Sequence, residues 1–166
     1  MKIKFLLIAL LFAGRVVAAD QTAYYNARVD TFRKDKNVYD VVMVGDSLTE
    51  RGNWSTFFPR IKVANRGVSG DSIQGVLGRI ETIRGTGAKR AFVMIGVNDL
   101  LSGGMTAAEI IPLYESLVDR LHGLGMQLFV ESTLYTDFPG RDKTNEEIKE
   151  VNRAIADFCN PRSTSV

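Results

Sequence analysis

The stretch VVMVGDSLTE, residues 41–50, joins an apolar run to a Gly-Asp-Ser turn and then to a polar segment. Its first four residues are apolar without polar alternation, which is typical of a strand buried on both faces of a parallel sheet. The turn places Ser47 where a strand ends and a helix begins, so its hydroxyl can project at the edge of the sheet. A serine in that position is a candidate nucleophile.

Three further apolar runs follow the same pattern, so strands are predicted at 39–45, 61–65, 90–96 and 126–133. Segments with helical spacing separate them, most clearly at 106–125, where apolar residues recur every three or four positions. Alternating strands and helices predict right-handed βαβ crossovers, and therefore an α/β fold: a three-layer αβα sandwich around a flavodoxin-like parallel sheet. The working residues of such a sheet lie at the carboxyl ends of its strands.

The first twenty residues predict a secretory signal peptide over residues 1–19. Two lysines precede an apolar run of nine residues, and small residues precede Asp20. We therefore expect cleavage near Ala19, export to the periplasm or the medium, and one domain over residues 20–166. No stable membrane span is expected, because spanning a bilayer takes about 20 apolar residues.

The composition excludes several kinds of partner and cofactor. Cleavage of the signal would leave 18 of the 21 basic residues against 19 acidic ones, so a nucleic-acid partner is not expected. Cys159 is the only cysteine, which excludes an internal disulfide and, with a single histidine, a zinc site. We expect no metal and no other cofactor, and we expect Cys159 to be a half-buried helical residue.

Two more motifs follow the second and third predicted strands. Gly70, in VSGDS, has no side chain to block a substrate, so its N–H can donate to a developing oxyanion, while Asp71 is expected to cap the next helix. Asn98, in IGVND, offers a side-chain amide as a further donor, and Asp99 is expected to cap a turn. Each motif alone is common in caps and turns, but three at successive strand ends indicate ester chemistry.

These motifs resemble those of the SGNH hydrolases, also called GDSL esterases and lipases, over residues 39 to about 158. GDSLTE resembles the family's nucleophile block, NRGVSGD its glycine block and GVNDL its asparagine block, in the family's order. The resemblance implies that Ser47 is the nucleophile and that Gly70 and Asn98 join the Ser47 N–H as oxyanion donors. Asp46, Asp71 and Asp99 are expected to support them.

GNWSTFFP and TNEEIKEVNRAI are most similar to segments of small exported bacterial members of that family, which resemble platelet-activating-factor acetylhydrolase and sugar O-acetylesterases. The resemblance implies hydrolysis of a small acyl ester through an acyl-enzyme, with a lipid, an aryl ester or an acetylated sugar as substrate. Aromatic and apolar residues after the first and fourth predicted strands are candidates for the substrate pocket. They are Trp54, Phe57, Phe58, Leu134 and Tyr135.

The base is harder to place. The family's last block is an Asp-x-x-His after the fifth strand, whereas His122, in DRLH, precedes the fourth predicted strand. His122 should therefore lie at the amino end of that strand, and a strand of five or six residues is about 17 to 20 Å long. That separation excludes a hydrogen bond with Ser47, so His122 is interpreted as a residue near a helix C-terminus, where its charge is favourable.

The segment NPRSTSV, residues 160–166, follows the last predicted helix and contains no apolar run. We therefore expect a sheet without its last strand, C-terminal helix and Asp-x-x-His block, with the fourth strand as an exposed edge and an impaired esterase. The alternative is a non-catalytic module of the same fold that binds a carboxylate, acetyl or sugar group. A flavodoxin-like cofactor binder is disfavoured, because RGTGAK lacks the glycine spacing of a phosphate loop.

Overall fold

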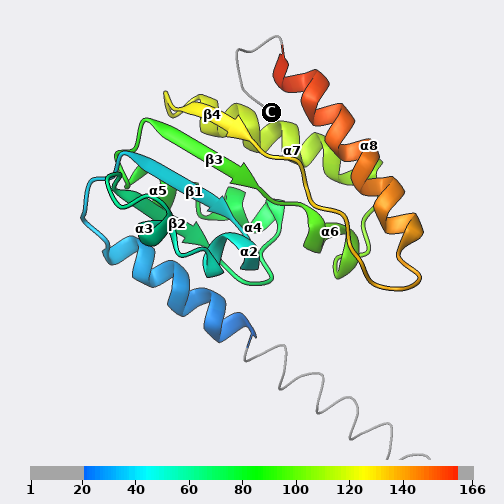
Figure 1. Ribbon diagram of the computed structural model, residues 1–166, viewed down its shortest axis with the longest axis horizontal. Helices are drawn as coiled ribbons and strands as arrows, with labels where there is room; N and C mark the ends of the chain where they lie inside the picture. The colour runs from blue at the N-terminus through cyan, green and yellow to red at the C-terminus, as the bar shows by residue number, and fades with distance from the viewer. Residues whose placement is uncertain (1–20, 161–166) are drawn as a thin grey trace, which may run out of the picture.

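The computed structural model describes residues 21–160, in which helices flank a four-stranded parallel sheet (Figure 1). The signal peptide predicted for residues 1–19 lies outside this range. The strands are β1 (Val41–Gly45), β2 (Val63–Gly67), β3 (Arg90–Met94) and β4 (Gln127–Val130). Their order is β2-β1-β3-β4. Each predicted run therefore contains a strand, although β2 begins and ends two residues later than predicted.

A helix over residues 21–34 precedes the sheet. The remaining helices are α2 (Ser47–Arg51), α3 (Trp54–Phe57), α4 (Ile73–Gly78), α5 (Ile80–Arg84), α6 (Val97–Leu101), α7 (Ala107–His122) and α8 (Asp142–Cys159). The helix predicted most clearly is α7, which begins after a capping box formed by Thr106 and Glu109. Pro112 lies in its first turns, where proline is tolerated.

The core lies between one face of the sheet and the helices α4, α5, α7 and α8. The buried residues of the sheet on this face are Val42, Val44, Ala64, Ala91, Val93, Leu128 and Val130, and they belong to one cluster with the buried faces of those helices. Cys159 is fully buried on the apolar face of α8, and not half-buried as predicted, because it continues the row of Ile148, Val151 and Ile155.

The opposite face of the sheet is covered less completely. Only β1 is buried along its whole length, whereas burial alternates along β3 and β4. The prediction that all four strands are buried on both faces is therefore wrong. Phe92 and Phe129 stack on this face with ring centroids 4.6 Å apart, and Trp54 and Phe58 lie over its β1 side.

The carboxyl ends of the strands meet at one edge of the sheet. Gly45 pairs in register with both Gly67 and Met94, so the chain leaves β1, β2 and β3 at the same level. The arrowheads of the strands in Figure 1 point to this edge, where α2 and α6 begin. No helix within residues 21–160 is long and apolar enough to cross a membrane.

Candidate active site

Ser47 is the first residue of α2, directly after β1. The carboxylate of Asp46 caps this helix, accepting a hydrogen bond of 3.0 Å from the backbone N–H of Leu48. Gly45 leaves no room for a side chain, since a Cβ there would lie 2.2 Å from Thr49 Oγ1 and 2.4 Å from the carbonyl oxygen of Met94. Close packing on both sides therefore holds the turn that presents Ser47.

The glycine loop follows β2 and closes in a four-residue turn. The N–H of Asp71 donates to the carbonyl of Val68 at 3.0 Å. Gly70 occupies the third position with φ of +77°, a conformation that residues with a side chain rarely adopt. Glycine is thus required here by the backbone itself, in addition to any need for a substrate to approach closely.

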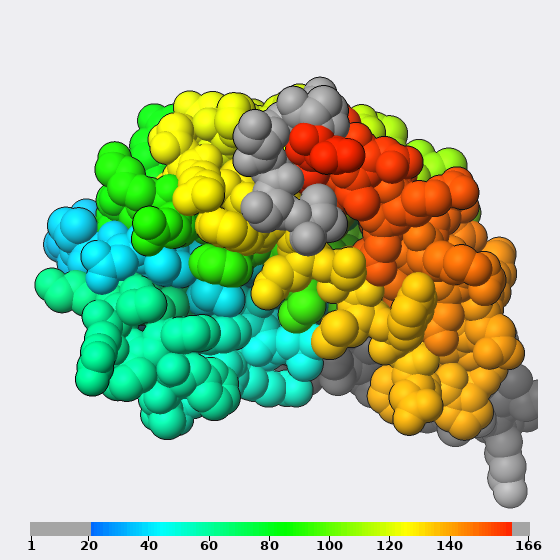
Figure 2. All heavy atoms as spheres, turned by 45° about the horizontal axis from the view of Figure 1, so that its top comes forward, coloured from blue at the N-terminus to red at the C-terminus, as the bar shows by residue number. Residues whose placement is uncertain are grey.

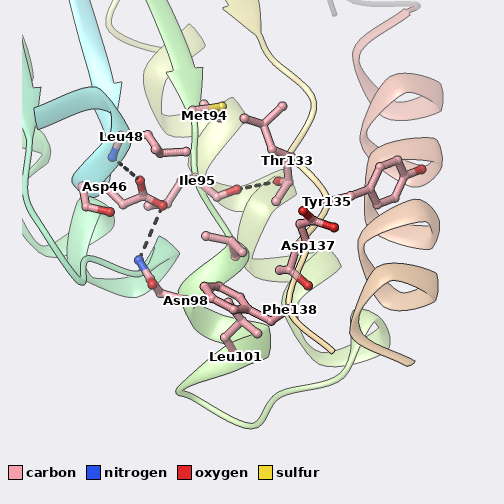
Figure 3. Close-up of a pocket in the computed structure, with 14 residues that line it drawn as sticks. Asp46, Leu48, Met94, Ile95, Asn98, Leu101, Thr133, Tyr135, Asp137 and Phe138 are labelled. Carbon is pink, nitrogen blue, oxygen red and sulfur yellow. Dashed lines mark hydrogen bonds between the residues drawn. The ribbon is translucent and has the colours of Figure 1, made fainter. Parts of the chain in front are cut away.

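Asn98, in α6, connects the turn that carries Ser47 (residues 45–47, the nucleophile turn) with the loop over residues 68–71 (the glycine loop). Its Nδ2 donates to the carbonyl of Asp71 at 2.8 Å and to Asp46 Oδ2 at 3.4 Å, the second of which is drawn in Figure 3. Asn98 and Ser47 line the same cavity. The prediction that these three motifs share one edge of the sheet is therefore confirmed, while the oxyanion roles of Gly70 and Asn98 stay predictions.

Asp71 does not cap α4 as predicted. The cap is Ser72, whose side chain accepts from the N–H of Gly75 at 3.1 Å. Asp71 instead forms an ion pair with Arg79, with Nη2 2.8 Å and Nε 2.9 Å from Oδ2, and both side chains are 1% exposed. A buried guanidinium needs a carboxylate partner, and this demand takes precedence over a local cap.

Asp99 does not cap its own turn either. Both of its carboxylate oxygens lie 3.2 Å from the backbone nitrogen of Ile73, which donates to them. Ile73 is the first residue of α4, so Asp99 satisfies the N-terminus of a helix 26 residues earlier in the chain. The carboxylate therefore binds α6 to α4 beneath the site.

Three carboxylates near Ser47 are buried, those of Asp46, Asp71 and Asp99, and Arg79 forms a buried ion pair with that of Asp71. Burial raises the pKa of Asp99 to about 6, and the charges of Asp71 and Asp46 act in the same direction. Burial also raises the pKa of Asp46 and, against the attraction of Arg79, that of Asp71. The negative charge beneath the site therefore costs stability at neutral pH.

Replacing Asp99 by asparagine is expected to remove part of this cost. The pKa of Asp99 is about 6 in the folded protein and near 3.8 without the fold, so the folded state binds the proton more tightly. Its contribution to the free energy of unfolding is full below pH 4 and falls by about 2 to 3 kcal/mol as the pH rises through 6. Urea unfolding at pH 4 and pH 7 measures the difference between the two proteins.

The Asp99→Asn variant should gain stability relative to the unchanged protein as the pH rises across this window. Asp30→Asn, the same change at an exposed carboxylate, is the control. Parallel pH dependences of Asp99→Asn and the unchanged protein would contradict the burial argument.

A cavity of about 310 Å³ lies at this edge, between α2, α6 and the loop after β4 (Figure 3). Leu134 and Tyr135 line it, as predicted for the substrate pocket. In Figure 2 this loop, coloured gold, lies against the cyan and green surface of α2 and α6. The other lining residues include Leu48, Leu101, Thr133, Asp137 and Phe138, which the sequence analysis missed. Thr133, Asp137 and Phe138 follow β4 at the edge that carries Ser47. Their position directly after a predicted strand is the feature of the sequence that could have indicated them.

Two asparagines of α8 hold the loop after β4. Asn152 accepts from the N–H of Thr133 at 2.8 Å and donates to its carbonyl at 2.9 Å. Asn145 makes the same pair of bonds with Thr136, at 2.8 and 2.9 Å. The wall of the cavity is therefore attached to α8 at two points.

Trp54, predicted for the substrate pocket, does not line this cavity. Its indole Nε1 donates to the carbonyl of Thr49 at 2.9 Å, and its ring stacks on Phe58. Both rings line a second cavity of about 290 Å³ against Val41 and Met43. The chain turns at Gly52 after α2, so α3 lies over a face of the sheet and not at the edge that carries Ser47.

His122 lies at the opposite edge of the sheet from Ser47. It is the last residue of α7, and the N–H of Gly125 donates to its carbonyl at 2.9 Å just before β4 begins. β4 pairs in register with β3 from the first residue of each strand, so the chain enters both at the same edge. A strand of five residues separates the two edges by about 13 Å or more. The prediction that His122 lies near a helix C-terminus, at the amino end of the fourth strand, is confirmed.

Residues 21–160 contain no group of three or more His, Cys, Asp or Glu side chains arranged to hold a metal ion.

Comparisons with known proteins show a family and a shared fold. Residues 43–166 match the GDSL-like Lipase/Acylhydrolase family. A Streptococcus pneumonia protein whose structure is named after platelet activating factor has a TM-score of 0.75 at 16% identity, over 93% of this chain and 77% of that one. A GDSL-like lipase from Bacteroides thetaiotaomicron has a TM-score of 0.69 at 20% identity, over 86% and 76%.

A catalytic mutant of an acetylxylan esterase from Geobacillus stearothermophilus has a TM-score of 0.63 at 17% identity, over 79% of this chain and 76% of that one. Likeness at these identities shows the fold. No curated protein matches the sequence.

Proposed function

The chain belongs to the GDSL-like lipase/acylhydrolase family, and on that basis we propose that Ser47 is the nucleophile of a serine ester hydrolase acting on small acyl esters. One observation carries the assignment of residues. The amide of Asn98 is bonded to Asp46 and to the carbonyl of Asp71, so the nucleophile turn, the glycine loop and the asparagine converge.

The proposed reaction proceeds through an acyl-enzyme. Ser47 Oγ loses its proton to solvent and forms a bond to the ester carbonyl carbon, and the carbonyl oxygen becomes an oxyanion. The N–H groups of Ser47 and Gly70 and the Nδ2 of Asn98 donate to it, with Asn98 giving up its longer contact of 3.4 Å with Asp46. The oxyanion collapses, the bond to the alcohol oxygen breaks, and the alcohol leaves with a proton from solvent while the acyl group stays on Ser47. Water then attacks the acyl group, which releases the acid and restores the hydroxyl of Ser47.

The cavity favours a small acyl group. Its volume is about 310 Å³, and the side chains of Leu101, Leu134 and Phe138 contribute apolar walls. Among the substrates that the resemblance implies, acetylated sugars, aryl acetates and short-chain lipid esters have acyl groups that fit such a space. Export after cleavage near Ala19 is part of the same proposal, since sugars and lipids of these kinds are met outside the cytoplasm.

The proposed site lacks a histidine base among the described residues. Within residues 21–160 the histidine lies at the other edge of the sheet, so no imidazole is within reach of Ser47. Loss of the base from a Ser-His unit can cost about a million-fold in turnover, although oxyanion donors alone can leave about a thousand-fold over water. We propose that this chain hydrolyses esters slowly.

Free imidazole is expected to restore part of the rate. It can take the proton from Ser47, because the cavity opens to solvent and a general base contributes a hundred-fold or more in enzymes. With 4-nitrophenyl acetate as substrate, the imidazole-dependent rate should exceed that of Ser47→Ala by at least about tenfold. The Ser47→Ala protein supplies the rate of the uncatalysed imidazole reaction.

The same experiment tests the alternative of a non-catalytic binding module, which the position of His122 favours. Equal imidazole-dependent rates for the unchanged protein and Ser47→Ala would contradict the esterase proposal. Calorimetry with acetate would then decide: binding that is lost on Asn98→Ala supports the module.

A further inference from the structure

The loop that carries Gly70 is held by Glu50. Oε2 of Glu50 accepts from both the backbone N–H and the hydroxyl of Ser69, at 2.5 and 2.6 Å. The other oxygen accepts from the hydroxyl of Tyr24 and lies 3.4 Å from Arg28 Nε. Burial acts to raise the pKa of Glu50, but the hydrogen bonds from Ser69 and Tyr24 outweigh it and lower that pKa. The carboxylate is therefore ionised at neutral pH.

The helix over residues 21–34 also binds the carbonyl of Ser69. Nε2 of Gln21 donates to Ser69 O at 3.0 Å. Ser69 O and the N–H of Gly70 belong to one planar trans peptide, so they point in opposite directions. A carbonyl directed at Gln21 therefore directs the Gly70 N–H away from helix 21–34.

This peptide has an alternative orientation. With φ of +77° at Gly70, the turn over residues 68–71 has the positive φ of a type II turn. A type I turn needs negative φ there and differs by a rotation of the peptide between its two central residues. Glycine tolerates both, so Gly70 itself does not select the orientation. The contacts of Ser69 must do so.

Glu50 also ties this loop to the nucleophile helix, because it lies on α2 three residues after Ser47. Nδ2 of Asn65 donates to the carbonyls of Thr49 and Glu50, at 3.0 and 2.9 Å, and thereby fastens α2 to β2. The distance between Ser47 and the glycine loop is thus set by these side chains.

We propose that Gln21 and Glu50 are positioning residues that set the direction of the Gly70 N–H, so that the N-terminal helix controls one oxyanion donor. The inference rests on the proposed function, in which the Gly70 N–H donates to the oxyanion. The orientation itself is a separate property and can be measured without a substrate.

The first test measures the N–H direction. Residual dipolar couplings of ¹⁵N-glycine-labelled protein report the N–H vector of Gly70 in the unchanged chain, in Gln21→Ala and in Glu50→Ala. The coupling of Gly70 should change in both variants, while those of Gly87 and Gly104, which also have positive φ and lie in other loops, stay the same. An unchanged Gly70 coupling in both variants would overturn the proposal.

The second test measures the donor's effect on an oxyanion mimic. Phenylboronic acid can bond to Ser47 Oγ, with loss of the hydroxyl proton to solvent, and its tetrahedral boron presents an oxygen to the donors. Its dissociation constant should rise about tenfold to a hundredfold in Glu50→Ala, because losing one oxyanion donor in an enzyme costs about a hundredfold or more. Glu50→Gln, which keeps an acceptor for Ser69, should show a smaller rise.

Glu81→Gln is the matched control, since that glutamate forms only an exposed pair with Arg84. Tyr24→Phe removes one contact to Glu50 and keeps the test available if Glu50→Ala fails to fold. Equal boronate affinity in the unchanged chain, Gln21→Ala and Tyr24→Phe would overturn the inference. Absence of boronate binding in the unchanged chain would count against Ser47 as nucleophile, and the dipolar couplings would still decide the positioning.

Discussion

Ser47→Ala should abolish covalent capture of an acyl group by this chain. Incubation of the unchanged protein with 4-nitrophenyl acetate is expected to add one acetyl group. Because 4-nitrophenolate is a good leaving group, whereas deacylation needs a base to activate water, the acyl-enzyme should accumulate. Removing the hydroxyl removes the proposed nucleophile, so labelling of the 41–50 region should fall at least about a thousand-fold. Intact mass spectrometry and peptide mapping measure it.

Ser55→Ala is a suitable control, because Ser55 lies on α3, over a face of the sheet. The Ser55→Ala protein should acquire the same acetyl group at Ser47 as the unchanged chain. Acetylation of lysines by the reagent is expected in all three proteins and is separated by mapping. An acetyl group on the 41–50 region that persists in Ser47→Ala, or no acetyl group there in the unchanged chain, would contradict the nucleophile assignment.

Arg79→Met should destabilise the fold by about 3 to 5 kcal/mol, the usual cost of leaving a buried charge without its partner. Both side chains of the Arg79–Asp71 pair are 1% exposed, so water cannot replace the guanidinium. Arg79 also contacts the ring of Phe32 at 5.7 Å and donates to the carbonyl of Gly45 at 3.4 Å, which adds to the loss. Urea unfolding should show a lower midpoint with an unchanged slope.

The double variant Arg79→Met with Asp71→Asn separates the two causes. It removes the unpaired carboxylate, so it should be more stable than Arg79→Met alone although it carries more changes. Arg84→Met, at an exposed pair in the next helix, should change stability by less than about 1 kcal/mol. A loss of similar size in Arg84→Met and Arg79→Met would contradict the burial argument.

The sequence places Ser47, Gly70 and Asn98 at one edge because this placement needs little more than strand order and direction. A run of buried apolar residues indicates each strand, and parallel strands bring their carboxyl ends together. The same rule places His122 at the other edge. These features depend on topology, which local patterns in the chain predict well.

The partners of the buried carboxylates depend on how the helices form and pack. Asp71 and Arg79 lie eight residues apart at the two ends of α4, and Asp99 reaches the N–H of Ile73 only across the interface of two helices. The prediction that Trp54 lines the substrate pocket is wrong for a related reason, since the turn at Gly52 decides which side of the sheet α3 covers. No periodicity in the sequence reports such directions.

Asn145 and Asn152 give the cavity wall an unusual form of support. Each side-chain amide offers a carbonyl and an N–H to one threonine of the loop, as the backbone of an adjacent strand would. In effect, α8 replaces a neighbouring strand with two amides spaced by two helical turns. The loop and α8 should therefore move as a rigid body, and the length of acyl chain accepted at the cavity should follow small shifts of α8 along its axis.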